Sequence, residues 1–382
     1  MTGIRTVEQD GVALARALED DGSALRPDWR GATPDGATAL AIWRAMLTTR
    51  LLDDRMLKLQ RQGRVAFVGT ATGLEAAIHG SAAAFEAEDW IFSGLREGGA
   101  AVQRGMPITE YVAHMFGNRE DTAKGRQMPN HFQCREARFV SWSSVIGTQL
   151  PHAVGVGMAF QRRGEARVVC AYSGDGATSS SGFHSALNFA GVYKSPVVFV
   201  VVDNGWAISV PSAKQTAARS YGAKARAYGM PGHDVDGNDF VAAWSITREA
   251  VARARRGEGP SLVCLRTYRM GGHSSSDDPT RYRDAAEVEY WAARDPLARA
   301  EAYLRAQGLL DGARLARTTE ELGARIAAAV EHAEAVGPPP LETLVEDVYA
   351  TPPRHLTRQV VDALRIRDEQ GEAAKIQGKF PL

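Results

Sequence analysis

The chain has 382 residues, of which 44% are hydrophobic and 24% are charged, a composition typical of a folded globular protein rather than a disordered one. Its 45 basic residues balance its 45 acidic residues, so the net charge gives no attraction to nucleic acid or to an anionic membrane. The three cysteines lie too far apart to suggest a zinc site or a disulfide framework. Without a signal core, a transit peptide pattern or an apolar run of roughly 20 residues, we expect a cytoplasmic protein that binds neither nucleic acid nor a membrane.

The first half of the chain is predicted to be mainly helix and loop. Residues 1–36 are polar, and we expect them to form an N-terminal extension that wraps over the surface or onto a partner. Apolar residues recur at helical spacing across 37–63, which predicts a long amphipathic helix. Small residues dominate 69–84 and favour a helix packed closely against another backbone. Loops rich in glycine, serine and arginine follow at 92–149.

The second half alternates strand and helix patterns. The stretch ARVVCAYS ends at residue 173, a helical pattern follows, and the run PVVFVVV ends at residue 202. Unbroken β-branched runs indicate strands that are buried on both faces, so we predict an α/β fold with a doubly wound, mostly parallel sheet and helices on both sides. A further strand at 261–268 precedes a charged helical segment at 285–336. We place the main domain at 37–336 and a helical C-terminal tail region at 337–382.

Polar residues follow two of the predicted strands. The tripeptide GDG, residues 174–176, ends the first strand, and Asn204 ends the second. Because the carboxyl ends of parallel strands meet at one edge of a sheet, we expect Asp175 and Asn204 to face one crevice. Their oxygens are donors that Mg²⁺ prefers when it also bridges phosphates. A lone GDG is more commonly a tight turn, but the strand context and the spacing favour a ligand site.

The GDG motif with an asparagine about 30 residues further on resembles the thiamine diphosphate-binding motif. From about residue 38 to 360 the chain is similar to the alpha subunits of 2-oxo acid dehydrogenases, and most similar to the branched-chain type. The supporting stretches are GTATGLEA (69–76), GRQMPNHFQCREARFVSWSS (125–144), GTQLPHAVG (147–155), LNFAGVYKSPVVF (187–199), NGWAISVP (204–211) and RMGGHSSSDDPTRYR (269–283).

The resemblance implies a set of ligands for the metal and the diphosphate. Asp175, Asn204 and the main-chain carbonyl of Trp206 would bind Mg²⁺. The main-chain N–H groups of Gly176 and Ala177 would donate to the diphosphate. These five residues would thus hold the charged end of the cofactor.

Four other residues are implied in cofactor binding or catalysis. Arg96 would pair with the diphosphate, since a planar fork of donors suits phosphate oxygens; the alternative is a solvated surface arginine. Ser144 and Ile146 would contact the thiazolium, with Ile146 as an apolar wedge that bends the cofactor, although such an isoleucine is more often part of a core. His273 is the predicted catalytic residue, an imidazole that titrates near neutrality and assists proton transfer or charge stabilisation around the substrate adduct; the alternative is an exposed loop histidine.

The same resemblance implies a potassium site. Its oxygens would come from Ser143, the carbonyl of Val145, Thr148 and Gln149. The family has proline where this chain has Val145, an exchange that a main-chain ligand tolerates. A hydrogen-bonded loop without a metal is an equally open alternative.

The chain departs from the family pattern at four places near the site. Leu95 replaces a tyrosine, Val202 replaces an arginine, and Asp203 replaces the first asparagine of a pair. Ser180 and Ser181 stand in a stretch that is more acidic in relatives. Because side chains alternate along a strand, we expect Val202 to face the site and the side chain of Asp203 to point elsewhere. These changes leave open how tightly the cofactor binds.

The implied activity is oxidative decarboxylation of a branched-chain 2-oxo acid, with transfer of the acyl group to a lipoyl group on an acyltransferase component. A beta subunit would complete the active site in an assembly of two alpha and two beta chains. Pyruvate or acetoin dehydrogenase is the alternative within this class, and a non-catalytic regulatory paralogue is the alternative outside it. A plain nucleotide-binding protein is disfavoured because no G-x-G-x-x-G follows the early strands.

Overall fold

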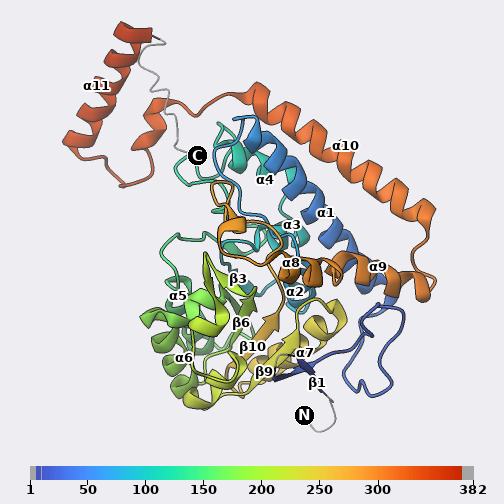
Figure 1. The fold of residues 1–382 in the computed structure, drawn as a ribbon. Coiled ribbons are helices and arrows are strands. Elements are labelled where there is room, and N and C mark those ends of the chain that lie inside the picture. The colour runs from blue at the N-terminus through green and yellow to red at the C-terminus, as the bar shows by residue number, and fades with distance from the viewer. Residues whose placement is uncertain (1–5, 10, 372–382) are drawn as a thin grey trace.

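The computed structural model describes residues 6–9 and 11–371 and is built around one large sheet (Figure 1). The order of its strands is β1-β2-β9-β10-β6-β5-β3-β4. Neighbouring strands from β2 to β4 are parallel, while β1 runs antiparallel to β2. The strands are β1 (Thr6–Gln9), β2 (Val12–Ala15), β3 (Trp90–Phe92), β4 (Phe139–Val140), β5 (Val169–Gly174), β6 (Val197–Asp203), β9 (Gly232–Asp236) and β10 (Ser261–Arg266), and a separate hairpin pairs β7 (Trp206–Ala207) with β8 (Val210–Pro211).

Helices cover both faces of this sheet. In β6, Val198, Val200 and Val202 belong to one apolar core, whereas Val197, Phe199 and Val201 belong to another. The first core is shared with α1 (Gly36–Arg61), α2 (Glu75–Ala82) and α7 (Phe240–Arg255). The second is shared with α5 (Gln149–Arg163) and α6 (Ser181–Tyr193). The predicted α/β fold with a doubly wound, mostly parallel sheet is therefore confirmed.

The predicted helix at 37–63 is confirmed as α1, but the segment at 69–84 becomes helical only at Glu75. Residues 69–74 form a loop in which Gly73 has a φ of +94°, a left-handed conformation that favours glycine. The close packing expected for this segment is observed in α2. A Cβ atom on Gly80 would lie 2.8 Å from the main-chain oxygen of Phe240 in α7.

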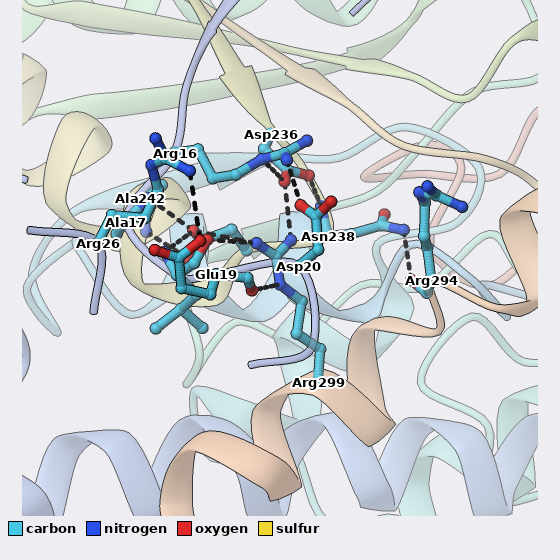
Figure 2. A network of polar contacts seen from close by, with 12 residues as sticks. Arg16, Ala17, Glu19, Asp20, Arg26, Asp236, Asn238, Ala242, Arg294 and Arg299 are labelled. Atoms are coloured by element: carbon cyan, nitrogen blue, oxygen red, sulfur yellow. Dashed lines mark hydrogen bonds and ion pairs between the residues drawn. The ribbon is translucent and has the colours of Figure 1, made fainter. Parts of the chain in front are cut away.

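The described part of the N-terminal extension does not only wrap over the surface, as expected, because its strands β1 and β2 belong to the sheet. Strand β2 pairs with β9 through Ala15 and Val235. A buried network then fixes the chain that follows (Figure 2): the Asp236 carboxylate lies 2.7 Å from both Arg16 Nε and Arg299 Nη1. The expected boundary near residue 36 coincides with the start of α1, yet ion pairs link the extension to the main domain across it.

The described chain after Asp284 is mainly helical, as predicted for 285–336. Helix α10 ends at Val336, and Gly337, with a φ of +76°, begins the GPPP stretch that stops it. In Figure 1 the last helix, α11, lies apart from the sheet. Within the described ranges, no helix is both long and apolar enough to cross a membrane. The remaining helices are α3 (Gly98–Gln103), α4 (Ile108–Phe116), α8 (Ala285–Ala292), α9 (Pro296–Ala306), α10 (Gly312–Val336) and α11 (Arg354–Gln370).

Candidate active site

A cavity of about 680 Å³ lies beyond the carboxyl ends of β5, β6 and β10. The strand register pairs Gly174 with Val202 and Asp203 with Arg266, so the residues that follow each strand emerge at the same edge of the sheet. Loops around Arg96, Met128 and Ser144 complete the walls. This is the place where open α/β sheets bind ligands.

Asp175 and Asn204 both line this cavity, as the sequence predicts. The Asp175 carboxylate is buried, and its Oδ2 accepts hydrogen bonds from Gln215 Nε2 at 2.5 Å and from Ser212 Oγ at 3.4 Å. Burial and the neighbouring charge of Asp203 raise the pKa of Asp175 to about 6. Burial and a nearby negative charge disfavour the ionised form of Asp175, and a bound cation would stabilise that form. Asp175 and Asn204 therefore fit a divalent metal site.

The third predicted metal ligand already has a hydrogen-bonding partner. The main-chain carbonyl of Trp206 accepts from Arg269 Nη1 at 3.0 Å, and Arg269 Nη2 donates to the Ile208 carbonyl at 2.8 Å. A carbonyl oxygen has two lone pairs, so a metal ion bound there would share this oxygen with Arg269 and lie close to its positive charge. Gly176 and Ala177 line the cavity as predicted, and a Cβ on Gly176 would lie 2.8 Å from the Cβ of Ala207, so only glycine fits there.

Two buried guanidinium groups, those of Arg96 and Arg269, also line the cavity. Arg96 is 7% exposed, which excludes the solvated surface alternative. Its Nη2 donates to the carbonyl of His273 at 2.7 Å, and its Nη1 donates to the carbonyl of Thr70. Among the residues that the structure describes, neither Arg96 nor Arg269 forms an ion pair with a carboxylate. Burial and the repulsion from Arg269 lower the pKa of Arg96 to about 10. Two such cations fit a polyanion such as a diphosphate.

His273 lies in the cavity wall, half-buried, and the exposed-loop alternative does not apply. Burial, followed by the charges of Arg96 and Arg269, lowers the pKa of His273 to about 4. The expectation that this imidazole titrates near neutrality is therefore wrong for this structure, because the sequence did not reveal the two cations beside it. The imidazole is neutral at pH 7.

Ser144 and Ile146 also line the cavity. The Ser144 hydroxyl lies 2.6 Å from His131 Nε2, and His131 Nδ1 lies 3.1 Å from the Met128 carbonyl. His131 Nδ1 therefore carries the proton, and its Nε2 accepts from Ser144. Ile146 is 54% exposed, so it is not a core residue and is free to contact a ligand.

Sequence reasoning did not assign Arg269, His131 or Gln215 to the site. Arg269 and His131 lie within stretches that carry the family resemblance, and Arg269 closely follows the end of β10. For Arg269, its position just beyond the end of a predicted strand was the sequence feature that could have indicated a role in the site. Gln215 lies in a loop without such a signal, and only its 2.5 Å hydrogen bond to Asp175 reveals it.

The predicted potassium ligands lie together in one short segment. Thr148 Oγ1 donates to the Val145 carbonyl at 2.6 Å, and the Val145 N–H donates to Ser143 Oγ at 3.2 Å. These bonds are those of a loop that needs no metal. Gln149 Nε2 donates to the Tyr172 carbonyl at 2.9 Å, while Gln149 Oε1 is buried without a hydrogen-bonding partner among the described residues. That oxygen is available to coordinate a cation. Potassium binding remains a prediction.

The departures from the family pattern have distinct structural roles. Leu95 and Val202 line the cavity and make it more apolar. Asp203 lies outside the cavity wall, as expected, but its Oδ1 accepts from Ser212 Oγ at 2.8 Å, and the same hydroxyl contacts Asp175. The inference that Asp203 points away from the site was therefore incomplete, since its charge acts on Asp175. Ser180 caps α6 by accepting from the Phe183 N–H at 3.2 Å.

Comparison with known proteins finds similar sequences over most of the chain. Residues 43–342 match the family described as the dehydrogenase E1 component. The mitochondrial 2-oxoisovalerate dehydrogenase subunit alpha 2 of Arabidopsis thaliana is 38% identical over 359 residues, 92% of this chain and 75% of that protein. The 2-oxoisovalerate dehydrogenase subunit alpha of Pseudomonas aeruginosa is 38% identical over 91% of this chain and 86% of its own length. The 3-methyl-2-oxobutanoate dehydrogenase subunit alpha of Mycobacterium tuberculosis is 46% identical over 70% and 71% of the two chains. This chain belongs to the dehydrogenase E1 component family.

Proposed function

We propose that this chain is the alpha subunit of the decarboxylating component of a branched-chain 2-oxo acid dehydrogenase complex, and that it binds thiamine diphosphate and Mg²⁺. The observation that carries the proposal is the arrangement of charge in one cavity. Asp175 and Asn204 offer oxygens to a divalent cation, and Arg96 and Arg269 offer buried positive charge to a diphosphate. The products are carbon dioxide and an acyl group that passes to a lipoyl group on the acyltransferase component.

Each side chain then has a defined task. When bound, thiamine diphosphate supplies the electron sink for decarboxylation. Asp175 and Asn204 hold the metal, and Arg96 neutralises the diphosphate. The neutral imidazole of His273 has its Nδ1 3.5 Å from Arg96 Nη2, so Nδ1 accepts and Nε2 carries the proton. His273 Nε2–H would then donate a hydrogen bond that stabilises negative charge developing on the reacting substrate.

The apolar part of the cavity supports a branched aliphatic substrate. Phe67, Leu95 and Trp142 line it, and each methylene group of a substrate that is buried against such a wall stabilises the complex by about 0.8 kcal/mol. Pyruvate or acetoin would leave much of this surface unfilled. The preference for branched-chain 2-oxo acids over these smaller substrates therefore follows from the composition of the wall.

A beta subunit completes the site. The chain offers one doubly wound sheet, and its strand ends are used by the metal and diphosphate groups. Exposed apolar side chains surround the cavity mouth, with Met128 53%, Ile146 54% and Ile208 55% exposed. We infer that the beta chain covers them in an assembly of two alpha and two beta chains, and that it contributes the carboxylic acid that activates the cofactor. The alternative of a non-catalytic paralogue is disfavoured because Asp175, Asn204 and Arg96 are all present and meet in one cavity.

Two measurements test the proposal. The chain is co-produced with its beta chain, and kcat/KM is compared for 3-methyl-2-oxobutanoate and pyruvate; a higher value for the branched substrate is expected. The chain alone, supplied with cofactor and Mg²⁺, is expected to show no decarboxylation. Faster turnover of pyruvate would refute the assignment of substrate, and activity of the chain alone would refute the shared site.

Calorimetry of the assembled enzyme tests the cofactor site separately. Asp175→Ala and Asn204→Ala are each expected to abolish Mg²⁺-dependent binding of thiamine diphosphate, because each removes an oxygen ligand from the metal. Unchanged affinity in both variants would refute the metal assignment. A wild-type enzyme that binds no cofactor would favour the non-catalytic paralogue.

A further inference from the structure

Residues 68–73, which we term the bridging segment, run between α1 and α2 without regular secondary structure. Val68, Gly69, Ala71 and Gly73 in this segment are buried. The main-chain groups of a buried loop must find their hydrogen bonds in the surrounding protein. The partners of this segment therefore reveal which parts of the molecule it connects.

The bridging segment holds three loops that line the cavity. The Thr70 carbonyl accepts from Arg96 Nη1. Gly69 bonds in both directions to the side-chain amide of Asn130, at 3.0 and 3.2 Å, and Asn130 lies beside His131 in the cavity wall. The segment also bonds to the loop that carries His273, through Thr267 Oγ1 to the Gly73 carbonyl (2.6 Å), the Met270 N–H to the Thr72 carbonyl (3.1 Å) and the Ser275 N–H to the Val68 carbonyl (2.9 Å).

Asp53 fixes the bridging segment to helix α1. Its Oδ2 accepts from the Ala71 N–H at 2.6 Å, and the residue is 4% exposed. On either side of it, Leu52 and Met56 are buried in the main apolar core, so the packing of α1 sets the position of the carboxylate. Asp53 does not line the cavity. It therefore contacts the site through the bridging segment.

We propose that Asp53 is a positioning residue for the cofactor site. Its hydrogen bond to Ala71 sets the place of the adjacent Thr70 carbonyl, and this carbonyl orients the Arg96 guanidinium. Arg96 in turn bonds to the carbonyl of His273 at 2.7 Å, so one buried carboxylate orders both the diphosphate-binding arginine and the catalytic loop. This inference rests on the proposed function, in which Arg96 binds the diphosphate.

The test compares Asp53→Ala with Asp53→Asn in the assembled alpha–beta enzyme. Burial raises the pKa of Asp53 to about 8, so asparagine, which keeps an oxygen at the same place, is a close mimic of the neutral acid. Thr49→Val is the matched control: Thr49 lies one turn earlier in α1, is buried, and bonds to His79 at 2.8 Å instead of to the bridging segment. Two quantities are measured, the dissociation constant of thiamine diphosphate at saturating Mg²⁺ and the hydrogen exchange of the amides at 69–73.

Asp53→Ala is expected to weaken cofactor binding about tenfold, the effect of losing one hydrogen bond to a buried acid, and to speed exchange at 69–73. Asp53→Asn should bind within about twofold of the wild type, and Thr49→Val should change neither quantity. Wild-type affinity and exchange in Asp53→Ala, or an Asp53→Asn variant as weak as Asp53→Ala, would overturn the proposal.

Two further outcomes are decisive as well. Should Asp53→Ala fail to fold, Asp53→Ser replaces it with the same expected result, because the shorter hydroxyl cannot reach the Ala71 N–H. Should the wild type bind no cofactor, the proposed function fails, whereas the exchange comparison still decides whether Asp53 orders the bridging segment.

Discussion

Arg96 donates a 2.7 Å hydrogen bond from Nη2 to the main-chain carbonyl of His273, so the residue assigned to the diphosphate and the residue assigned to catalysis form one unit. The other terminal nitrogen of Arg96 bonds to Thr70. A planar guanidinium reaches both carbonyls at once, which an ammonium group on a flexible chain does not reproduce. The position of His273 therefore depends on the side chain at residue 96.

This relationship predicts different defects for Arg96→Ala and Arg96→Lys. The alanine variant loses the charge and both hydrogen bonds, and we expect thiamine diphosphate to bind about 100-fold more weakly, as for the loss of a strong charge-assisted contact. The lysine variant keeps the charge but loses the fork, and we expect a loss of about tenfold together with a lower kcat. Calorimetry and steady-state kinetics check both values. Wild-type kcat in Arg96→Lys would contradict the coupling to His273.

For His273 itself we predict a defect in rate without a defect in binding. Replacing it by alanine removes the hydrogen-bond donor at Nε2, and the rate of decarboxylation or acyl transfer should fall about 10²-fold or more. The dissociation constant of the cofactor should change little, because Arg96 and the metal ligands remain. Single-turnover kinetics with saturating cofactor measures the step directly. A turnover near that of the wild type would show that His273 is dispensable.

Asp203 is predicted to strengthen metal binding in this chain. The Ser212 hydroxyl lies 2.8 Å from the Asp203 carboxylate and 3.4 Å from that of Asp175. A cation bound at Asp175 is therefore also attracted by the negative charge of Asp203. Asp203→Asn keeps the shape and removes the charge, and we expect the affinity for Mn²⁺, used as a spectroscopic substitute for Mg²⁺, to fall about tenfold or more. Unchanged Mn²⁺ binding in paramagnetic resonance titrations would exclude this electrostatic role.

Acid sensitivity is predicted to arise partly from His79. Thr49 and Gln103 hydrogen-bond to its buried ring, and burial lowers the pKa of His79 to about 4 from 6.5. As the pH falls below 6.5, His79 binds a proton in the unfolded chain before it does so in the folded one, which favours unfolding. The free energy of unfolding is therefore unaffected by His79 above pH 6.5 and decreases between pH 6.5 and 4, by at most about 1.4 kcal/mol per pH unit. His79→Gln should therefore flatten the decline between pH 6.5 and 4 in urea denaturation. An equally steep decline in the variant would assign the acid sensitivity to other groups.

The sequence by itself determined the sheet and the shared location of Asp175 and Asn204, the two side chains proposed to bind the metal. The run PVVFVVV has no polar face, so it required cores on both sides of the strand, and β6 has them. The spacing of Asp175 and Asn204 at two strand ends was sufficient to bring them to one edge, because parallel strands share the direction of their carboxyl ends. The buried strand and the shared edge depend only on the local residue pattern and on chain direction, and both can be read from the sequence.

Only the tertiary structure decided which groups surround these residues. Arg269 reaches the Trp206 carbonyl, Asp203 reaches Asp175 through Ser212, and Asp53 reaches Ala71. Each contact joins side chains or main-chain groups whose separation is set by the packing of helices and loops against the sheet. The low pKa of His273 has the same origin, since it depends on burial and on two cations from other segments. Electrostatic interactions act through space, so their strength is fixed only once the fold has set the distances.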